Sequence, residues 1–295
     1  MKIAAIVQAR TGSSRLPGKV LKELPPGCGV TVLEHVVTRL RHSSLLNDVI
    51  IATTTESDDD RLVSEIQKAQ VLYFRGSQND VLSRYYFAAK ENDVDVIVRI
   101  TSDCPCLDPK IIDDAIQMHL DTDADYTSNT LKRTYPHGMD VEVFNFEVLK
   151  EAHERATEPY EREHVCPYIY KSNPGAFKIS HLIAPDGICE PDIRITLDTQ
   201  EDYDLLCAVF DCLYSPDNLF CLTDIIELFD NKPWLRAINK NVVQKIIVET
   251  FDQEFDESVR VLKLRGYDRV SELLMKNRKS FCDLYINNTS VQADE

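Results

Sequence analysis

Residues 2–19 read KIAAIVQARTGSSRLPGK, a short apolar strand followed by a loop rich in hydroxyls and cations. Arg10, Arg15 and Lys19 carry positive charge, and Gly12 lets the backbone approach a ligand closely. Successive N–H groups in such a loop can form a concave anion-binding nest. We therefore expect a phosphate-binding loop at the end of a first β-strand, with a solvated surface loop as the alternative.

The loop matches neither of the common nucleotide-binding motifs. Gly12 and Gly18 are spaced before Lys19 as in a Walker A motif, but Val20 follows where that motif requires Ser or Thr. The pattern G-x-G-x-x-G does not fit this loop either. The residues of the loop therefore leave both an anion-binding loop and a solvated surface loop open.

The first 120 residues alternate between strands and helices. Segments with the composition of strands lie at residues 2–7, 48–53, 71–74 and 94–101. Segments with helical character connect them, at residues 31–45, 59–70 and 80–91. Asp108 and Pro109 then provide the N-cap and first residue of another helix. This order predicts an α/β fold with a mainly parallel, doubly wound sheet, which binds ligands beyond the carboxyl ends of its strands.

The second half of the chain is less regular. We expect strands at residues 140–144, 177–183 and 193–197, and helices at residues 146–156, 159–171 and 201–213. After about residue 230 only helical patterns remain, with apolar stripes in residues 241–250 and 266–278. We therefore expect a first domain of residues 1–230 and a helical C-terminal extension of residues 231–295, either an appendage or an oligomer contact.

Composition narrows the function classes. The net charge of −16 over 295 residues disfavours nucleic acid and anionic membranes as partners but permits a nucleotide in a local cationic pocket. No stretch approaches the ~20 apolar residues that span a bilayer, and a strand stands where a signal peptide would begin. The nine cysteines contain no C-x-x-C pair, and Cys104 and Cys106 have no partners at zinc spacing. We expect a cytoplasmic protein with reduced thiols.

Two aspartates follow segments that we expect to be strands. Asp103 follows residues 94–101 with only Ser102 between them, and Asp198 comes directly after residues 193–197. Each could simply cap a helix, and Asp202 is more typical of a first helical turn. Together with the basic loop, however, two carboxylates at one sheet edge suit Mg²⁺, which completes its coordination with water and phosphate oxygens. We predict a Mg²⁺ site at Asp103 and Asp198.

Further polar residues cluster in the middle of the chain: Asn129, His137, Asp140, Glu142, Arg162, Glu163, His164 and Arg194. A structural role is the favoured interpretation for His137 and His164. Around the turn after the third strand, Arg75, Ser77 and Arg84 could reach a base or ribose, although the start of a helix at Asp80 explains that turn equally well.

Several stretches resemble, in the same order, the cytidylyltransferases that make CMP-activated sugars. They are ARTGSSRLPGK (9–19), RGSQNDVLSRYY (75–86), VIVRITSDCPCLDP (96–109), YTSNT (126–130), YPHGMDVEVF (135–144), YEREHVCPYIY (160–170) and DIRITLDTQEDYDLL (192–206). The closest branch looks like the SpsF-type spore-coat polysaccharide proteins. CMP-N-acetylneuraminate and CMP-KDO synthetases are similar at a greater distance. The resemblance covers roughly residues 1–230.

This resemblance implies a fold of the nucleotide-diphospho-sugar transferase type and a homodimer. It also implies that a sugar hydroxyl attacks the α-phosphate of CTP and releases pyrophosphate. The implied catalytic residues are Arg10, Lys19, Asp103 and Asp198, the two aspartates matching the family's metal ligands. The implied nucleotide-binding residues are Ala9, Arg10, Thr11, Gly12, Ser13, Ser14, Arg15, Lys19, Arg75, Gly76, Ser77 and Asp103.

The acceptor sugar stays open, because the chain departs from both better-known branches. Thr196 stands where the sialic-acid branch has the first aspartate of a D-x-D pair, and residues 101–105 read TSDCP where the KDO branch has an acidic stretch. The acceptor-binding candidates are Asn129, His137, Asp140, Glu142, His164 and Arg194. For an acceptor carboxylate the candidates are Lys132, Arg133, Arg162 and Arg194, with Arg194 the best placed.

The chemistry agrees with these residues, since nucleotidyl transfer depends on positioning and charge neutralisation more than on a covalent catalyst. The attacking hydroxyl could lose its proton to a metal-bound hydroxide or to a nearby carboxylate, and the sequence does not choose. Two other functions stay open. One is a nucleotidyltransferase for another base, or a glycosyltransferase on the same fold. The other is a non-catalytic nucleotide-binding protein that assembles through its helical tail.

Overall fold

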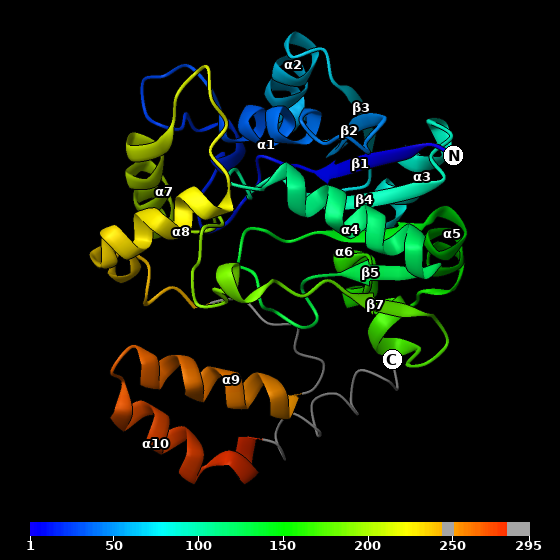
Figure 1. The fold of residues 1–295 in the computed structure, drawn as a ribbon. Helices are drawn as coiled ribbons and strands as arrows, with labels where there is room; N and C mark the ends of the chain where they lie inside the picture. Colours follow the sequence, from blue (N-terminus) through cyan, green and yellow to red (C-terminus); the bar gives the residue numbers. More distant parts are fainter. Residues whose placement is uncertain (244–250, 282–295) are drawn as a thin grey trace. The chain divides into compact units, whose positions relative to one another are not determined.

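The computed structural model describes residues 1–243 and 251–281 (Figure 1). The chain forms two compact units, Met1–Asn239 and Lys240–Glu295. The domain boundary expected after residue 230 stays a prediction. Most of the helix expected at residues 241–250 lies outside the described residues. Among the described helices, none is long and apolar enough to cross a membrane.

The first unit is built on a seven-stranded sheet with the order β3-β2-β1-β4-β6-β5-β7. The strands are β1 (Ile3–Gln8), β2 (Asp48–Thr54), β3 (Leu72–Gly76), β4 (Val96–Thr101), β5 (Tyr126–Ser128), β6 (Glu142–Asn145) and β7 (Ile179–His181). The first four are parallel to one another, β6 is antiparallel to β4 and β5, and β7 is parallel to β5. The mainly parallel α/β fold expected from the sequence is confirmed.

Helices cover both faces of this sheet. They are α1 (Val32–Arg41), α2 (Asp60–Lys68), α3 (Val81–Glu91), α4 (Pro109–Thr122), α5 (Phe146–Arg155), α6 (Pro159–His164), α7 (Gln200–Leu213) and α8 (Leu222–Asn231). Alternate residues of β1 pack into two different hydrophobic cores, one on each face of the sheet. Ile3, Ala5 and Val7 belong to the core that includes α1, α4, α7 and α8. Ala4 and Ile6 belong to the core under α3 and α5, as the two-residue period of a strand requires.

Several helices begin where side chains cap them. Thr31 and Glu34 form a reciprocal capping box at α1, and Asp108 accepts a hydrogen bond from the Lys110 N–H at α4, where Pro109 is the first residue. Thr199 and Asp202 form a second capping box at α7. The expected cap at Asp108 and the first-turn position of Asp202 are both confirmed.

Two expected elements of the second half are wrong. The strand expected at residues 193–197 is an extended segment with a single bridge, between Arg194 and His137, because its partner is a turn and not a strand. The helix expected at residues 159–171 ends at His164 and a π-helical turn follows at Tyr168–Ser172. Pro167 explains the break, since its ring lacks an N–H and would clash with the preceding turn of a continuous helix.

The extended segment 193–198 is nevertheless fixed in place. His137 exchanges backbone hydrogen bonds with it, from its N–H to Ile193 O (2.9 Å) and from the Ile195 N–H to His137 O (2.8 Å). The Leu197 N–H donates to Asp103 O (2.8 Å). Through these bonds the segment carries Asp198 to the edge of the sheet where β1 and β4 end.

The second unit contains α9 (Phe251–Leu264) and α10 (Asp268–Lys276), which lie side by side (orange and red in Figure 1). Gly266, with φ of 74°, makes the turn between them. Phe255 and Val259 are the buried apolar residues of α9, and Arg278 pairs with Asp252 and Asp256. The expected helical C-terminal extension is thus present.

Gly138 provides a test of how the 193–198 segment is held. Its φ is +116°, and a Cβ there would lie 2.7 Å from both Ile195 C and Ile195 O. We expect Gly138→Ala to lower the free energy of unfolding by about 2–4 kcal/mol in urea denaturation. Gly187→Ala is the control, because a Cβ there meets nothing within 4 Å. Equal stability of the two variants would contradict this account of the segment.

Candidate active site

Lys19 lies at the centre of the candidate site. It opens the 3-10 helix Lys19–Leu21, directly after Gly18, whose φ of 66° lets the loop turn back. Its Nζ donates to Asp103 Oδ2 (2.7 Å), Asp198 Oδ1 (2.9 Å) and Leu197 O (2.7 Å). Burial alone would lower the pKa of Lys19, but the charges of Asp103 and Asp198 raise it above its ordinary value. The loop after β1 and both predicted aspartates therefore meet at one point.

Asp198 is surrounded by cations. Arg15 Nη2 lies 3.0 Å from its Oδ1, and Arg194 Nη2 lies 3.0 Å from its Oδ2. Burial alone would raise the pKa of Asp198, but the Lys19 and Arg15 charges and the hydrogen bonds from Lys19 and Arg194 lower it to about 2. Asp198 is therefore fully ionised at neutral pH.

The two aspartates have the chemistry of a magnesium site. Oδ2 of Asp103 and Oδ1 of Asp198 converge on the same nitrogen, so both face one small volume at the carboxyl edge of the sheet. Carboxylate oxygens are the protein ligands that Mg²⁺ prefers, and it needs only one or two of them when phosphate and water complete its coordination. The donor set thus fits a divalent cation.

The buried carboxylate of Asp202 holds Arg194 in position. Its Nε and Nη2 each lie 2.9 Å from an oxygen of Asp202, a bidentate pair in which Asp202 is fully buried. Asn239 Nδ2 donates to Asp202 Oδ1 (2.9 Å) and to Arg194 O (3.0 Å). Arg194 is therefore fixed at the position from which it reaches Asp198.

His137 extends the network on the other side of Arg194. Arg194 Nη1 lies 2.9 Å from His137 Nδ1, and because arginine only donates, Nδ1 must be the acceptor. The neutral ring then carries its proton on Nε2, which lies 3.8 Å from Asp140 Oδ2. Burial, followed by the charges of Arg133 and Arg194, lowers the pKa of His137 despite Asp140. At neutral pH His137 offers an N–H donor rather than a base.

Asp59 connects the cationic loop of residues 9–19 to the end of β2 by hydrogen bonds. The Thr11 N–H and Oγ1 both donate to Asp59 Oδ1 at 2.7 Å, and Thr54 Oγ1 donates to Oδ2. Within the loop, the N–H groups of Ser13 and Gly18 both donate to Thr11 O at 2.9 Å. Asp59 is 2% exposed, so this tether is shielded from water. Thr11 thus closes the loop and joins it to the end of β2.

A sequence model of the family described as cytidylyltransferase matches residues 4–227, which include the loop and both aspartates. The chain belongs to the cytidylyltransferase family. It is an enzyme of the nucleotidyltransferase class.

Relatives of this cytidylyltransferase occur in archaea and bacteria. An uncharacterized protein of Methanocaldococcus jannaschii is 41% identical over 248 residues, which are 83% of this chain and 97% of that protein. The spore coat polysaccharide biosynthesis protein SpsF of Bacillus subtilis is 36% identical over 213 residues, 70% of this chain and 86% of that protein. The structure of a cytidylyltransferase from Leptospira borgpetersenii is similar with a TM-score of 0.74 and 35% identity, covering 83% of this chain and all of that one.

The residues of the cytidylyltransferase loop after β1 differ in their exposure to solvent. Arg10, Gly12, Ser14 and Arg15 are exposed, while Ala9 is buried at the end of β1. Ser13 Oγ accepts a weak hydrogen bond from the Leu16 N–H (3.4 Å). The role of these residues in nucleotide binding stays a prediction.

Arg75, near the end of β3, binds a neighbouring loop of the cytidylyltransferase. Arg75 donates to Thr54 O (2.8 Å) and Glu56 O (3.0 Å), and it pairs with Asp60 (2.8 Å). These contacts of Arg75 hold residues 54–60, which include Asp59, in place.

Gly76 and Ser77 continue this structure. A Cβ on Gly76 would lie 2.9 Å from Cγ of the buried Arg84, which itself donates to Ser77 O (3.1 Å). Ser77 Oγ accepts from the Asp80 N–H (3.2 Å) at the start of α3. Direct contact of Arg75, Gly76 or Ser77 with a nucleoside stays a prediction.

Several acceptor candidates have structural partners. Asn129 bridges backbone groups, donating to Met139 O (2.6 Å) and accepting from the Val141 N–H (2.9 Å). Glu142 is buried and pairs with Arg99 and Tyr126. These contacts fix β5 and β6 in place and leave the acceptor-binding role of both residues as a prediction.

Other acceptor candidates lie in two places. Asp140 forms a bidentate pair with Arg133 (2.7 and 3.0 Å) beside His137. Arg162 instead pairs with Asp80, and His164, half-buried, ends α6. His137, Asp140 and Arg194 therefore form a continuous group next to Asp198, whereas Arg162 contacts Asp80 and His153.

Sequence reasoning missed Asp59 and Asn239. Asp59 lies in the run TTTESDDD (53–60). Acidic residues are common at the start of a helix, so this run alone does not indicate a further role for Asp59. Asn239 is more than thirty residues beyond the last motif and has no sequence signal. Only the three-dimensional contacts assign them to the site.

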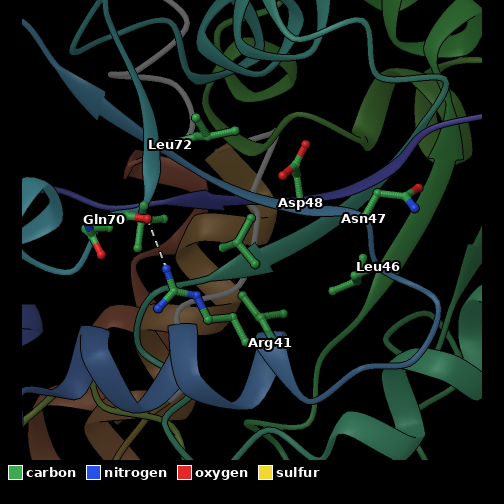
Figure 2. A pocket seen from close by; sticks show the side chains of 9 residues that line it. Arg41, Leu46, Asn47, Asp48, Gln70 and Leu72 are labelled. Carbon is green, nitrogen blue, oxygen red and sulfur yellow. Dashed lines mark hydrogen bonds between the residues drawn. The ribbon is translucent and has the colours of Figure 1, made fainter.

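A pocket of about 210 Å³ lies elsewhere, at the amino ends of β2 and β3 (Figure 2). Arg41, Asn47, Asp48 and Leu72 are among its lining residues, and Arg41 donates to Ala69 O and Gln70 O. Since ligands of doubly wound sheets bind beyond the carboxyl ends, this pocket is separate from the candidate site.

We predict that Asp59 sets the affinity for CTP through Thr11. Asp59→Asn removes the charge that orders the loop, so the Kd for CTP should rise about tenfold by calorimetry. Asp58→Asn is the matched control, since the exposed Asp58 contributes only its backbone O to Thr11. Unchanged CTP affinity in Asp59→Asn would contradict the tether.

We predict that His137 is the Nε2–H tautomer, with a pKa below 6.5 because burial and two neighbouring guanidinium groups disfavour the imidazolium. Long-range ¹H–¹⁵N NMR reports the tautomer, and a pH titration reports the pKa. Arg194→Met should raise the pKa of His137, whereas Arg155→Met on the exposed face of α5 should leave it unchanged. A proton on Nδ1 at neutral pH would refute the assignment.

Proposed function

We propose that this enzyme transfers CMP from CTP to a sugar hydroxyl and releases pyrophosphate in a Mg²⁺-dependent reaction. The observation that carries the proposal is the convergence of Lys19, Asp103 and Asp198 beside the cationic loop. Cations at one side suit a triphosphate, and paired carboxylates suit the metal that accompanies it.

The loop after β1 supplies the triphosphate side. Arg10 and Arg15 are exposed there, and Lys19 is at its end, so all three can approach phosphate oxygens. As the bond to the α-phosphate breaks, negative charge grows on the leaving pyrophosphate, and these fixed cations stabilise it. Thr11 and Asp59 keep the loop in place without reorganisation.

Asp103 and Asp198 hold the metal in this proposal. When bound, Mg²⁺ neutralises the phosphate charge and orients the triphosphate for in-line attack. Arg194 and its buried partner Asp202 keep Asp198 at the site. The low pKa of Asp198 means that this ligand needs no deprotonation at neutral pH.

His137, Asp140 and Arg133 are the favoured acceptor side, because they continue the network that begins at Asp198. The Nε2–H of His137 can donate to a sugar oxygen, and the Arg133 guanidinium can bind an acceptor carboxylate. The Bacillus relative is named for spore coat polysaccharide biosynthesis. By analogy, we propose an acidic or otherwise modified sugar destined for a surface polysaccharide or glycan.

We further propose that the enzyme is a cytoplasmic homodimer. Its eight described cysteines are free thiols, as in a reducing compartment. The C-terminal extension exposes Leu264, Tyr267 and Leu273, which could serve as a contact between subunits.

Pyrophosphate release with each of the four nucleoside triphosphates and a panel of sugar acids tests the function. We expect turnover with CTP and Mg²⁺, and a loss of at least about 100-fold in kcat for Asp103→Asn, because a metal ligand is removed. Asp211→Asn, on the exposed side of α7, should retain turnover. No turnover and no calorimetric binding with CTP would refute the proposal, and a preference for another base would favour a different nucleotidyltransferase.

A further inference from the structure

The Lys19 ammonium has no spare hydrogen-bond donor in the free protein. An ammonium carries three N–H donors. The three partners of Nζ are Asp103 Oδ2, Asp198 Oδ1 and Leu197 O, at 2.7, 2.9 and 2.7 Å. The side chain is only 12% exposed, so water contributes little to its solvation. To donate to a phosphate, Lys19 must therefore give up at least one of these partners.

The position of Nζ is also the position that a shared cation would take. Mg²⁺ binds oxygen at about 2.0–2.1 Å, closer than the 2.7 and 2.9 Å at which the Lys19 nitrogen lies from these oxygens. An ion held by both Asp103 Oδ2 and Asp198 Oδ1 would therefore lie where the Lys19 nitrogen now lies. The ammonium and the divalent cation exclude each other, sterically and by charge repulsion.

The charges around Asp198 are already balanced without a metal. The cations in its ion-pair network are Lys19, Arg15 and Arg194, and the carboxylates are Asp103, Asp198 and Asp202. A divalent cation that arrived alone would meet no excess negative charge. When a metal ion binds together with a nucleoside triphosphate, the negative charge of the phosphates balances the positive charge of the metal.

We infer that Lys19 keeps the divalent cation out of the free enzyme, and that a nucleoside triphosphate admits it by drawing Lys19 from the two carboxylates to its phosphates. The inference rests on the proposed roles of Asp103 and Asp198. Before the substrate binds, Lys19 keeps the two carboxylates directed at one point. After it binds, the same ammonium neutralises phosphate charge, so metal and nucleotide bind cooperatively.

Mn²⁺ binding to the full-length enzyme without any nucleotide tests this inference. In electron paramagnetic resonance titrations, Lys19→Met should bind Mn²⁺ at least about tenfold more tightly than the wild type, because a close, partly buried positive charge is removed. Lys19→Gln should give the same gain in Mn²⁺ affinity, and it replaces Lys19→Met in the test if the Met variant does not fold. Mn²⁺ alone should also raise the Tm of these variants more than that of the wild type.

Arg15→Met is the matched control. It removes the same charge from Asp198 Oδ1, but Arg15 is 41% exposed and pairs with Asp198 and not with Asp103, so the gain should stay below about threefold. Equal Mn²⁺ affinity of the wild type and the Lys19 variants would overturn the inference. So would an equal gain in Arg15→Met, or no Mn²⁺ binding in any variant. Failure of the proposed function would instead appear as absent turnover with CTP, which these titrations do not measure.

Discussion

The site depends on one ion cluster, in which Lys19 joins Asp103 and Asp198. These residues are far apart in the sequence, so their contact requires that the loop after β1, the end of β4 and the 193–198 segment all reach the same edge. Charged groups taken out of water are costly unless they are paired. Each of these side chains is therefore stabilised by the others, and the loss of one would weaken the compensation of its partners.

Around this cluster the fold adds further hydrogen bonds and ion pairs that hold its members in place. Asp202 and Asn239 hold Arg194, which holds Asp198 from the side opposite Lys19. Asp59 holds the loop after β1 through Thr11. Such preorganisation matters for nucleotidyl transfer, because the enzyme gains rate from fixed charges and oriented groups rather than from a covalent intermediate.

The parallel half of the fold and the centre of the site were predictable, because apolar strands and the residues that directly follow them are local signals. Asp103 was expected at the site because it follows a strand closely, and Lys19 because it is a cation of the loop after β1; the structure brings the two together. Asp198 was found for a partly wrong reason, since the segment before it pairs with the His137 turn and is not a strand. Asp59 and Asn239 could not be found, because their roles arise from contacts with Thr11 and Asp202 that no periodicity encodes.

A crystal structure of the enzyme with CTP and Mg²⁺ tests the central claim most directly, namely that the Lys19 cluster is the triphosphate and metal site. The account predicts one metal ion bound to both Asp103 and Asp198, with Lys19 Nζ moved onto the phosphates. A triphosphate bound away from the loop of residues 9–19, or a Lys19 that still lies between the two carboxylates with metal and nucleotide present, would contradict it.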